Sequence, residues 1–332
     1  MPGQRGGKGW ILGLALAGAA LGAPAVASAV IRRRAEPPQA PRWGRARRYA
    51  SHSGEIVFQE LGHRRSDTHD APPVVLLHAL GPGYDSQQWR AAAEILADGR
   101  AVYVPDLPGW GRSQAPRGHA PAPHLYVAAL EDFLTEVVRE PAVVVAAGHA
   151  APFAVRVAVE NPRAVRALGL VCPAGLTGAD RQPGDGFVAR LLRLPVLKDT
   201  VLDLLTGRSA LEHHLRREVY AAPERVDAAL LDHHYRASHL ARARGIYAAW
   251  LRGDLWKEVG ADELGQLKVP VWLAWGRAAA EPPVERADLW LRQLPAEGTE
   301  IDILEGSGSL PHAETPAVFT RALERFLGRI RG

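Results

Sequence analysis

Short, continuously apolar runs alternate with helix-like segments along most of the chain. The runs lie at residues 73–78, 101–106, 142–147, 167–172, 269–275 and 300–304. Segments with helical spacing lie between most of them, at 88–97, 124–139, 152–161 and 285–294. Continuous Val, Leu and Ile runs separated by helices are typical of a parallel sheet covered on both faces. The pattern therefore predicts an α/β fold with a doubly wound, mostly parallel sheet.

One long interval, between Cys172 and Val269, contains no strand-like run. Its segments at 187–205, 210–220, 226–238 and 241–251 have helical composition and periodicity. A helical insertion at this point of an α/β sheet would lie over the carboxyl ends of the strands, where ligands bind. We therefore predict a helical cap at 177–261, inserted into a core formed by 51–176 and 262–332. The alternative is a helical extension packed elsewhere.

Residues 10–31 form an uncharged, mostly apolar segment of 22 residues. It is long enough to cross a bilayer as a helix, and it is preceded by two basic residues and followed by seven as far as Arg48. The positive-inside rule then predicts a membrane anchor with the body of the protein in the cytoplasm. The alternative is an exported protein whose signal peptide is cleaved near Ala29. Residues 1–50 are thus predicted to hold an anchor or signal segment and a basic, Pro-containing linker.

The charge of the chain is unevenly distributed. Residues 1–50 carry nine Lys and Arg side chains against one Glu, which leaves 31 basic and 35 acidic side chains in the rest. A mildly acidic body argues against nucleic acid as a partner. Cys172 is the single cysteine, so no intrachain disulfide can form. The histidines lack metal-ligand spacing, and Gly81-Pro82-Gly83 lacks the spacing of a dinucleotide site, so neither a metal nor another cofactor is predicted.

Several motifs follow the predicted strands in a fixed order. They are His78-Ala-Leu-Gly-Pro-Gly83, Asp106-Leu-Pro-Gly-Trp-Gly-Arg-Ser113, the turn at 148–152, Trp275-Gly276, and the loop from Gly308 to Pro316 with Glu314. Together they resemble the α/β-hydrolase family over residues 55–330. The resemblance implies that fold, with a helical cap after the sixth core strand and an oxyanion segment at 78–83.

The resemblance also assigns three catalytic positions. Acyl transfer in this family needs a nucleophile, a histidine base and an orienting carboxylate. The nucleophile position of the G-x-S-x-G turn falls on Ala150, the acid position on Ala279 and the base position on Ser309. Pro152 replaces the second glycine of the turn. All three triad positions are therefore predicted to have lost their chemistry.

Neighbouring residues are considered as substitutes for the missing groups. They are His149, His312, Cys172 and Glu281. The resemblance further implies oxyanion-type backbone amides at Leu80 and Ala151, and a pocket wall formed by His78, Ala79 and His149.

The sequence therefore predicts a membrane-anchored, catalytically degenerate protein of this fold. Its ligand would be a small apolar or acyl molecule in the former substrate pocket, or a protein partner. One alternative is an active hydrolase that uses His149, His312 or Cys172. The other is a structural partner of an envelope protein.

Overall fold

The computed structural model describes Pro38 and residues 41–330, except residues 53, 63–70, 115–119, 181–183 and 185. One sheet of eight strands organises this part of the chain, in the order β1-β2-β4-β3-β5-β6-β7-β8. Strand β2 is antiparallel to both of its neighbours, and β3 to β8 run parallel. The strands are β1 Arg45–Ser51, β2 Gly54–Leu61, β3 Val74–Leu77, β4 Val102–Pro105, β5 Ala142–Ala147, β6 Val165–Val171, β7 Val271–Gly276 and β8 Thr299–Leu304. The predicted fold class is confirmed.

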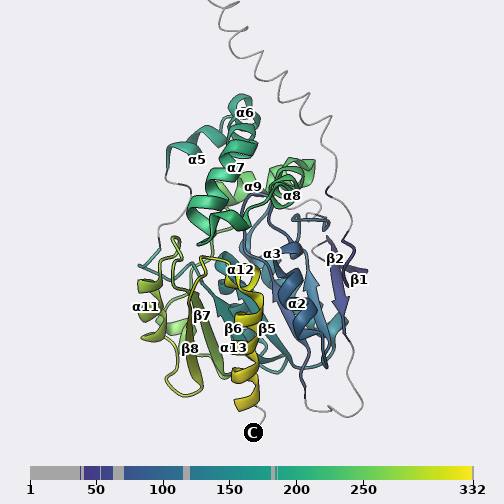
Figure 1. The fold of residues 1–332 in the computed structure, drawn as a ribbon, viewed down its shortest axis with the longest axis vertical. Helices are drawn as coiled ribbons and strands as arrows, with labels where there is room; N and C mark the ends of the chain where they lie inside the picture. The colour runs from purple at the N-terminus through teal and green to yellow at the C-terminus, as the bar shows by residue number, and fades with distance from the viewer. Residues whose placement is uncertain are drawn as a thin grey trace, which may run out of the picture.

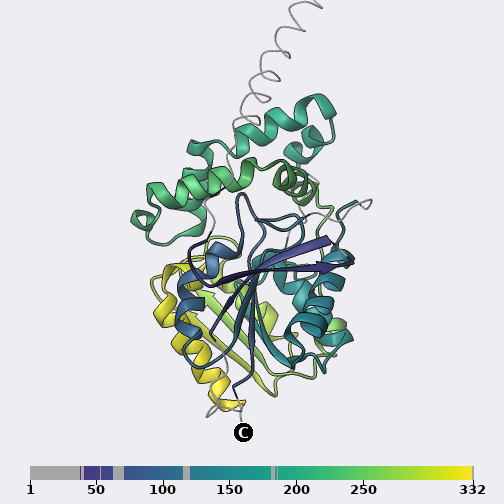
Figure 2. The same cartoon turned by 90° about the vertical axis from the view of Figure 1, so that its right-hand side faces the viewer.

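Helices cover both faces of the sheet, because the central strands are apolar on both sides (Figures 1 and 2). Along β5 all six residues are buried, and Val143 and Val145 join the core on one face while Val144 joins the core on the other. The helices α3 Pro123–Asp132, α4 Ala151–Glu160 and α11 Ala287–Leu291 pack on the Val144 face. On the opposite face lie α2 Arg90–Leu96 and α13 Pro316–Arg329.

A group of helices between β6 and β7 stands over one end of the sheet (Figure 1). These helices are α5 Phe187–Leu192, α6 Pro195–Leu205, α7 Arg208–His214, α8 Ala228–His239 and α9 Ala241–Leu251. The predicted segment 187–205 divides into α5 and α6, since Pro195 cannot continue a helix that precedes it. The cap therefore follows the sixth strand, as expected.

The sheet extends further toward the N-terminus than the sequence pattern indicated. Strand β1 pairs with β2 from Arg45↔Glu60 to Ser51↔Gly54, so residues 45–50 are a strand and not a linker. The charged alternation of β1 hid it, because three of its seven residues are exposed Arg side chains at the sheet edge. Within the described ranges, no helix has the length and apolarity needed to span a bilayer. The predicted anchor at 10–31 lies outside those ranges.

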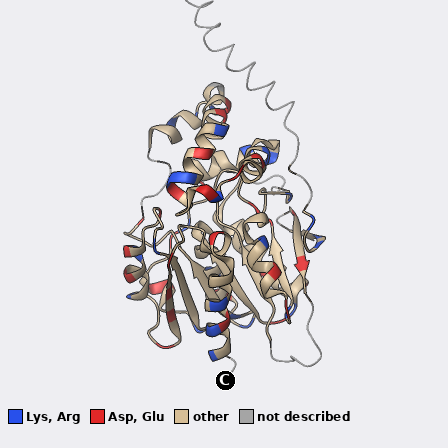
Figure 3. Cartoon of the chain, viewed as in Figure 1, with Lys and Arg blue, Asp and Glu red and all other residues tan. Residues whose placement is uncertain are grey.

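Charged residues of both signs lie along the core and the cap (Figure 3). Residues 51–332 hold 31 basic and 35 acidic side chains, so the two signs nearly balance there.

Candidate functional site

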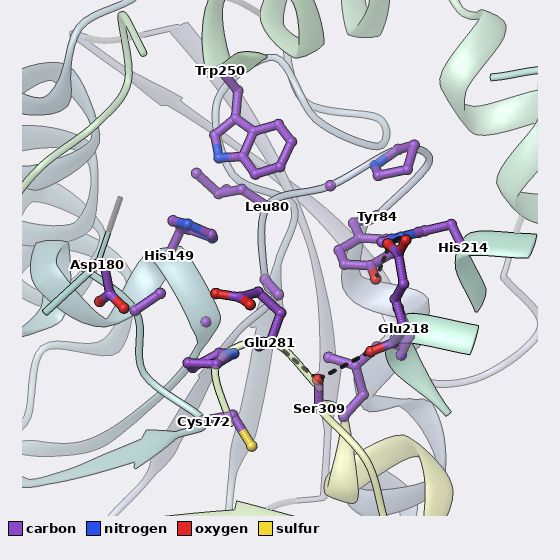
Figure 4. Close-up of a pocket in the computed structure, with 18 of the residues that line it drawn as sticks. Leu80, Tyr84, His149, Cys172, Asp180, His214, Glu218, Trp250, Glu281 and Ser309 are labelled. Atoms are coloured by element: carbon purple, nitrogen blue, oxygen red, sulfur yellow. Dashed lines mark hydrogen bonds and ion pairs between the residues drawn. The ribbon is translucent and has the colours of Figure 1, made fainter. Parts of the chain in front are cut away.

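A cavity of about 340 Å³ lies where loops from the sheet meet the cap (Figure 4). The loop after β3 contributes Leu80, the turn after β5 contributes His149, and the cap contributes Trp250. The complete lining is Ala79, Leu80, Gly81, Pro82, Tyr84, Gly148, His149, Cys172, Ala174, Asp180, His214, Glu218, Val219, Trp250, Trp256, Glu281, Pro282, Ser309 and Leu310. Its size and mostly apolar walls suit a small-molecule site.

The sharp turn after β5 is built around Gly148. This residue has a φ of 53°, in the left-handed region, and it lines the cavity. Ala150 has right-handed helical angles of −79° and −16°, is fully buried, and does not line the cavity. A nucleophile elbow needs its central residue strained and exposed to substrate. That geometry falls on Gly148, two residues before the position indicated by the motif, and neither residue carries a nucleophile.

The predicted amide donor at Ala151 is already used. Its N–H donates to the carbonyl oxygen of Gly148, which also accepts from the amide of Ala174 at 3.2 Å. Ala151 is fully buried and does not line the cavity, so its role as a free donor is corrected. With Gly148 at the apex, the following amide belongs to His149. Leu80 lines the cavity, as expected for the second donor segment.

The positions after β7 and β8 carry no acid and no base. Ala279 is 7% exposed and presents only a methyl group. The hydroxyl of Ser309 donates to the carbonyl oxygen of Glu281 at 2.9 Å, with a longer contact to that of Glu218 at 3.5 Å. Ser309 thus cross-links two loops through their backbones and holds no imidazole in the place of a base.

His149 lies in the cavity wall between two tryptophans of the cap. Its ring centroid is 5.4 Å from that of Trp250 and 5.2 Å from that of Trp256. Burial lowers the pKa of His149 to about 4, so the imidazole is neutral at physiological pH. It can accept or donate a hydrogen bond to a ligand, but it offers no positive charge.

His312 is not in the cavity, so its proposed role as a substitute base is wrong. The short helix α12 Pro311–Glu314 directs it to the α2 side of the sheet, where it stacks on Trp89 with ring centroids 3.6 Å apart. Neither ring nitrogen has a hydrogen-bond partner. Burial lowers the pKa of His312 to about 3, and the neutral ring behaves as part of the apolar core.

Cys172 ends β6 and lines the cavity, but its thiol is not activated. Burial raises its pKa to about 12, although the amide of Gly276 approaches the sulfur at 3.4 Å and favours the thiolate. A thiol with this pKa has almost no thiolate at neutral pH. The structure therefore favours an inert cysteine over a nucleophile.

His78 is a structural residue behind the cavity wall. Its Nδ1 donates to the carbonyl oxygen of Ala79 at 2.8 Å, and its Nε2 accepts from the amide of Leu107 at 3.0 Å. The side chain is fully buried and does not line the cavity, so the pocket role predicted for His78 is corrected. Ala79 and His149, the other two predicted wall residues, do line the cavity.

A hydroxyl–imidazole–carboxylate series joins Tyr84 of the loop after β3 to His214 and Glu218 of the cap. The sequence did not reveal it. The hydroxyl of Tyr84 lies 3.4 Å from Nε2 of His214, whose Nδ1 lies 2.6 Å from the carboxylate of Glu218. All three residues line the cavity (Figure 4). The i,i+4 spacing of His214 and Glu218 was the available signal, but nothing in the sequence placed Tyr84 against them.

Other cap and loop residues in the walls also escaped prediction. Trp250 and Trp256 were interpreted as packing residues, yet both line the cavity. Asp180 lines it as well, and its carboxylate accepts from the amides of Gly175 and Leu176 at 2.6 and 2.9 Å. Among the described residues, no group of three or more His, Cys, Asp or Glu side chains is placed to hold a metal ion.

Comparisons with known proteins agree with this architecture. A model of the alpha/beta hydrolase family matches residues 74–322. A protein of Mycobacterium tuberculosis (strain H37Rv), named only as uncharacterized, is 28% identical over 273 residues, which cover 77% of this chain and 75% of the relative. The 2-hydroxymuconate semialdehyde hydrolase of Pseudomonas sp. (strain CF600) is 29% identical over 117 residues, 34% of this chain and 41% of that enzyme.

Two solved structures illustrate the likeness of the fold. A serine hydrolase involved in carbazole degradation, the CarC enzyme, superposes with a TM-score of 0.70 and 21% identity, over 86% of this chain and 98% of that chain. A membrane phospholipase A superposes with a TM-score of 0.69 and 21% identity, over 98% of each chain. At this level of identity the likeness concerns the fold alone.

Proposed function

Because the chain belongs to the alpha/beta hydrolase family but carries Gly148, Ala279 and Ser309 where catalysis needs a triad, we propose that it is a ligand-binding pseudohydrolase. It keeps the family's cavity and binds a small, largely apolar molecule there without cleaving it. A concave cavity with mostly apolar walls favours such a ligand over a protein partner.

The observation that carries this proposal is the turn after β5. Its left-handed residue faces the cavity and has no side chain, so no nucleophile can be presented there. The nearest alternative nucleophile, the Cys172 thiol, has a pKa of about 12, and the Ser309 hydroxyl is bonded to carbonyl oxygens. Neither is paired with an imidazole in the described part of the chain, and pairing is what activates a nucleophile in acyl transfer.

The experiment that tests this proposal measures turnover and binding on the same purified protein. We expect no hydrolysis of short- and long-chain aryl esters above a buffer blank, with circular dichroism showing a folded sample. We also expect a small apolar ligand to bind saturably. The titration is monitored by intrinsic tryptophan fluorescence, to which Trp250 and Trp256 in the cavity wall contribute. Clear ester turnover would contradict the proposal.

A second candidate function is hydrolysis through the series Tyr84–His214–Glu218. It is favoured by the order of hydroxyl, imidazole and carboxylate, which matches the logic of a serine triad. Burial raises the pKa of the Tyr84 hydroxyl, which makes it a poor nucleophile. If ester turnover is found, Tyr84→Phe should abolish it under this second function, whereas Cys172→Ala should abolish it if the thiol is the nucleophile.

We also propose that residues 10–31 hold the protein at a membrane, with the body on the cytoplasmic side. The support is the uncharged segment and the greater number of basic residues that follow it. Alkaline carbonate extraction of cell membranes tests the anchor: the full chain should stay with the membrane pellet. Release of the protein into the supernatant, or an N-terminus of the mature protein near residue 30, would favour the exported form.

A further inference from the structure

The cavity has an unusual balance of charge for a site expected to hold an acyl group. Three carboxylates line it, from Asp180, Glu218 and Glu281, and the described residues of its lining include no Lys or Arg. We propose that the ligand is an organic cation, a substituted ammonium group on a small apolar body, and that Glu281 is its counter-charge. This inference rests on the proposed function, since it names the class of ligand for the same cavity.

Two of the three carboxylates already have partners. The carboxylate of Asp180 accepts two backbone N–H groups and lies 3.5 Å from the guanidinium of Arg286. The carboxylate of Glu218 is 2.6 Å from Nδ1 of His214. Both carboxylates therefore already have polar partners within the protein.

Glu281 is different. Its side chain makes no hydrogen bond or ion pair with any described residue, and Figure 4 shows the carboxylate pointing into the cavity on the side of His149. Its backbone is fixed, because its carbonyl oxygen accepts the Ser309 hydroxyl at 2.9 Å. Glu281 is an exposed residue of the cavity lining, and an unpaired carboxylate beside mostly apolar walls attracts a ligand of opposite charge.

The aromatic side chains complete the site. Trp250 and Trp256 from the cap, together with Tyr84 from the loop after β3, line the same cavity as Glu281. Aromatic faces bind substituted ammonium groups through the ring quadrupole, with tryptophan the strongest of the three aromatic types. His149 lies against both tryptophans and is neutral at pH 7, so it does not repel a cation.

The same features disfavour an acyl ligand that carries a carboxylate. A fatty-acid carboxylate in this cavity would be repelled by Glu281, and the described lining holds no Lys or Arg to offset the repulsion. A neutral molecule is not excluded by charge but leaves Glu281 unpaired. A cation with an apolar body uses both the carboxylate and the aromatic walls.

Isothermal titration calorimetry of the full chain can separate these cases with three probes of one shape. They are choline, its neutral isostere 3,3-dimethylbutan-1-ol, and the anion 3,3-dimethylbutanoate. We expect choline to bind about tenfold or more tightly than the alcohol, and no binding of the anion. In Glu281→Gln, choline affinity should fall about tenfold while that of the alcohol stays unchanged.

Two further variants make the test specific. Glu285→Gln removes an exposed carboxylate that does not line the cavity, and it should leave the binding of all three probes unchanged. Trp256→Leu should weaken choline more than the alcohol. Unfolding midpoints close to that of the unmodified protein would show that each variant folds.

The outcomes distinguish this inference from the function on which it rests. If the alcohol binds as tightly as choline, or if Glu281→Gln keeps the preference for choline, the cation is wrong and the binding protein stands. If none of the three probes binds, and no small apolar ligand changes the tryptophan fluorescence saturably, the proposed function itself is contradicted.

Discussion

Two sets of loops at the same end of the sheet differ in which polar side chains of the family's motifs they carry. The loop after β4, residues 106–113, which we call the Asp106 loop, keeps the Asp106 carboxylate and the Ser113 hydroxyl of its motif in buried hydrogen bonds. The turns after β5, β7 and β8, which we call the emptied turns (residues 148–150, 277–281 and 307–310), hold Gly148 at the left-handed position and Ala279 and Ser309 at the positions that the resemblance assigns to the acid and the base.

The Asp106 loop is a closed hydrogen-bond network. The carboxylate of Asp106 accepts from the amides of Ser86 and Arg112, both at 2.8 Å. The Ser113 hydroxyl donates to the carbonyl oxygen of Asp106 at 2.6 Å and accepts from the amide of Val57 at 2.8 Å. Gly111, with a φ of 49°, leaves no room for a side chain, since an added Cβ would lie 2.4 Å from Cγ of Asp106.

The contrast has a physical reason. Polar groups in the Asp106 loop are buried, so removing one leaves its partners unsatisfied away from water, at a cost of about 1–3 kcal/mol each. Exchange of a side chain that faces a cavity leaves no buried partner unsatisfied, so it costs little stability. A chain of this fold can therefore change its triad positions without losing the fold.

The largest effect is expected from Asp106→Ala. It removes the acceptor of two buried amides and of the nearby Arg112 side chain, so the free energy of unfolding should fall by about 3–5 kcal/mol. Urea denaturation followed by circular dichroism measures this change. Asp98→Ala, at an exposed turn, is the matched control and should stay within about 0.5 kcal/mol. Equal midpoints for the two variants would remove the basis of the comparison.

The next effect is expected from refilling the emptied turns. The triple variant Gly148→Ser, Ala279→Asp, Ser309→His should hydrolyse aryl esters at least ~100-fold faster than Gly148→Ser alone, because the three groups act as a unit. A second triple variant with Ala150→Ser in place of Gly148→Ser should stay inactive, since that position is fully buried. Activity only in the second variant would mean that Ala150, and not Gly148, occupies the nucleophile position of the turn.

A smaller effect distinguishes two buried histidines. Replacing His312 by Phe removes two unsatisfied nitrogens and should stabilise the fold by about 1 kcal/mol at pH 7. Replacing His78 by Phe leaves the amide of Leu107 without its acceptor and should destabilise the fold by about 1–3 kcal/mol. The same sign for both variants in urea denaturation would contradict these assignments.

The pH dependence of stability follows from the same residue. The folded-state pKa of His312 is about 3, against 6.5 for an ordinary histidine, so between these values only the unfolded chain binds the proton. Stability should therefore fall as the pH is lowered, with His312 contributing a loss of about 2 kcal/mol between pH 7 and pH 5. His312→Phe should show a shallower decline over this range, and an unchanged slope would argue against a buried neutral ring.

The smallest effect is expected at Ser309. Its hydroxyl bonds to carbonyl oxygens at a partly exposed position, so Ser309→Ala should cost about 0.5–1 kcal/mol. Ser113→Ala, which breaks two buried hydrogen bonds of the Asp106 loop, should cost about 1–3 kcal/mol. Thermal unfolding of the two variants measures the difference in stability directly. A greater loss of stability in Ser309→Ala than in Ser113→Ala would contradict the comparison between the two sets of loops.

Much of the architecture could be predicted from local patterns. The apolar runs gave six of the eight strands, and α9 matches the predicted segment 241–251. Strand β1 was missed because an exposed edge strand rich in Arg resembles linker sequence, and β2 because its apolar run, Ile56-Val57-Phe58, is short and flanked by charged or polar residues. The acid and base positions, Ala279 and Ser309, were assigned by the resemblance to the family, which counts them from Gly276 and Glu314.

The candidate site was predicted less completely, and Gly148 explains part of the reason. The G-x-S-x-G pattern places the nucleophile at Ala150, but the residue with a positive φ is Gly148, two positions earlier. The pattern misses this because it does not encode where the strand ends. His312 fits the family's loop by proximity in sequence, yet its helix turns it to the other side of the sheet. Trp250 and Trp256 carry no signal that separates a cavity wall from an ordinary core position.

The sequence by itself determined the layered α/β fold and the inserted cap, because these depend on the periodicity of apolar residues and on the order of a few motifs. Only the tertiary structure decided that Gly148 is the apex of the turn, that His149 is neutral, and that Glu281 points unpaired into an aromatic cavity. The physical reason is that burial and the pairing of charges depend on contacts between residues far apart in the chain. These contacts form only when the cap packs on the sheet.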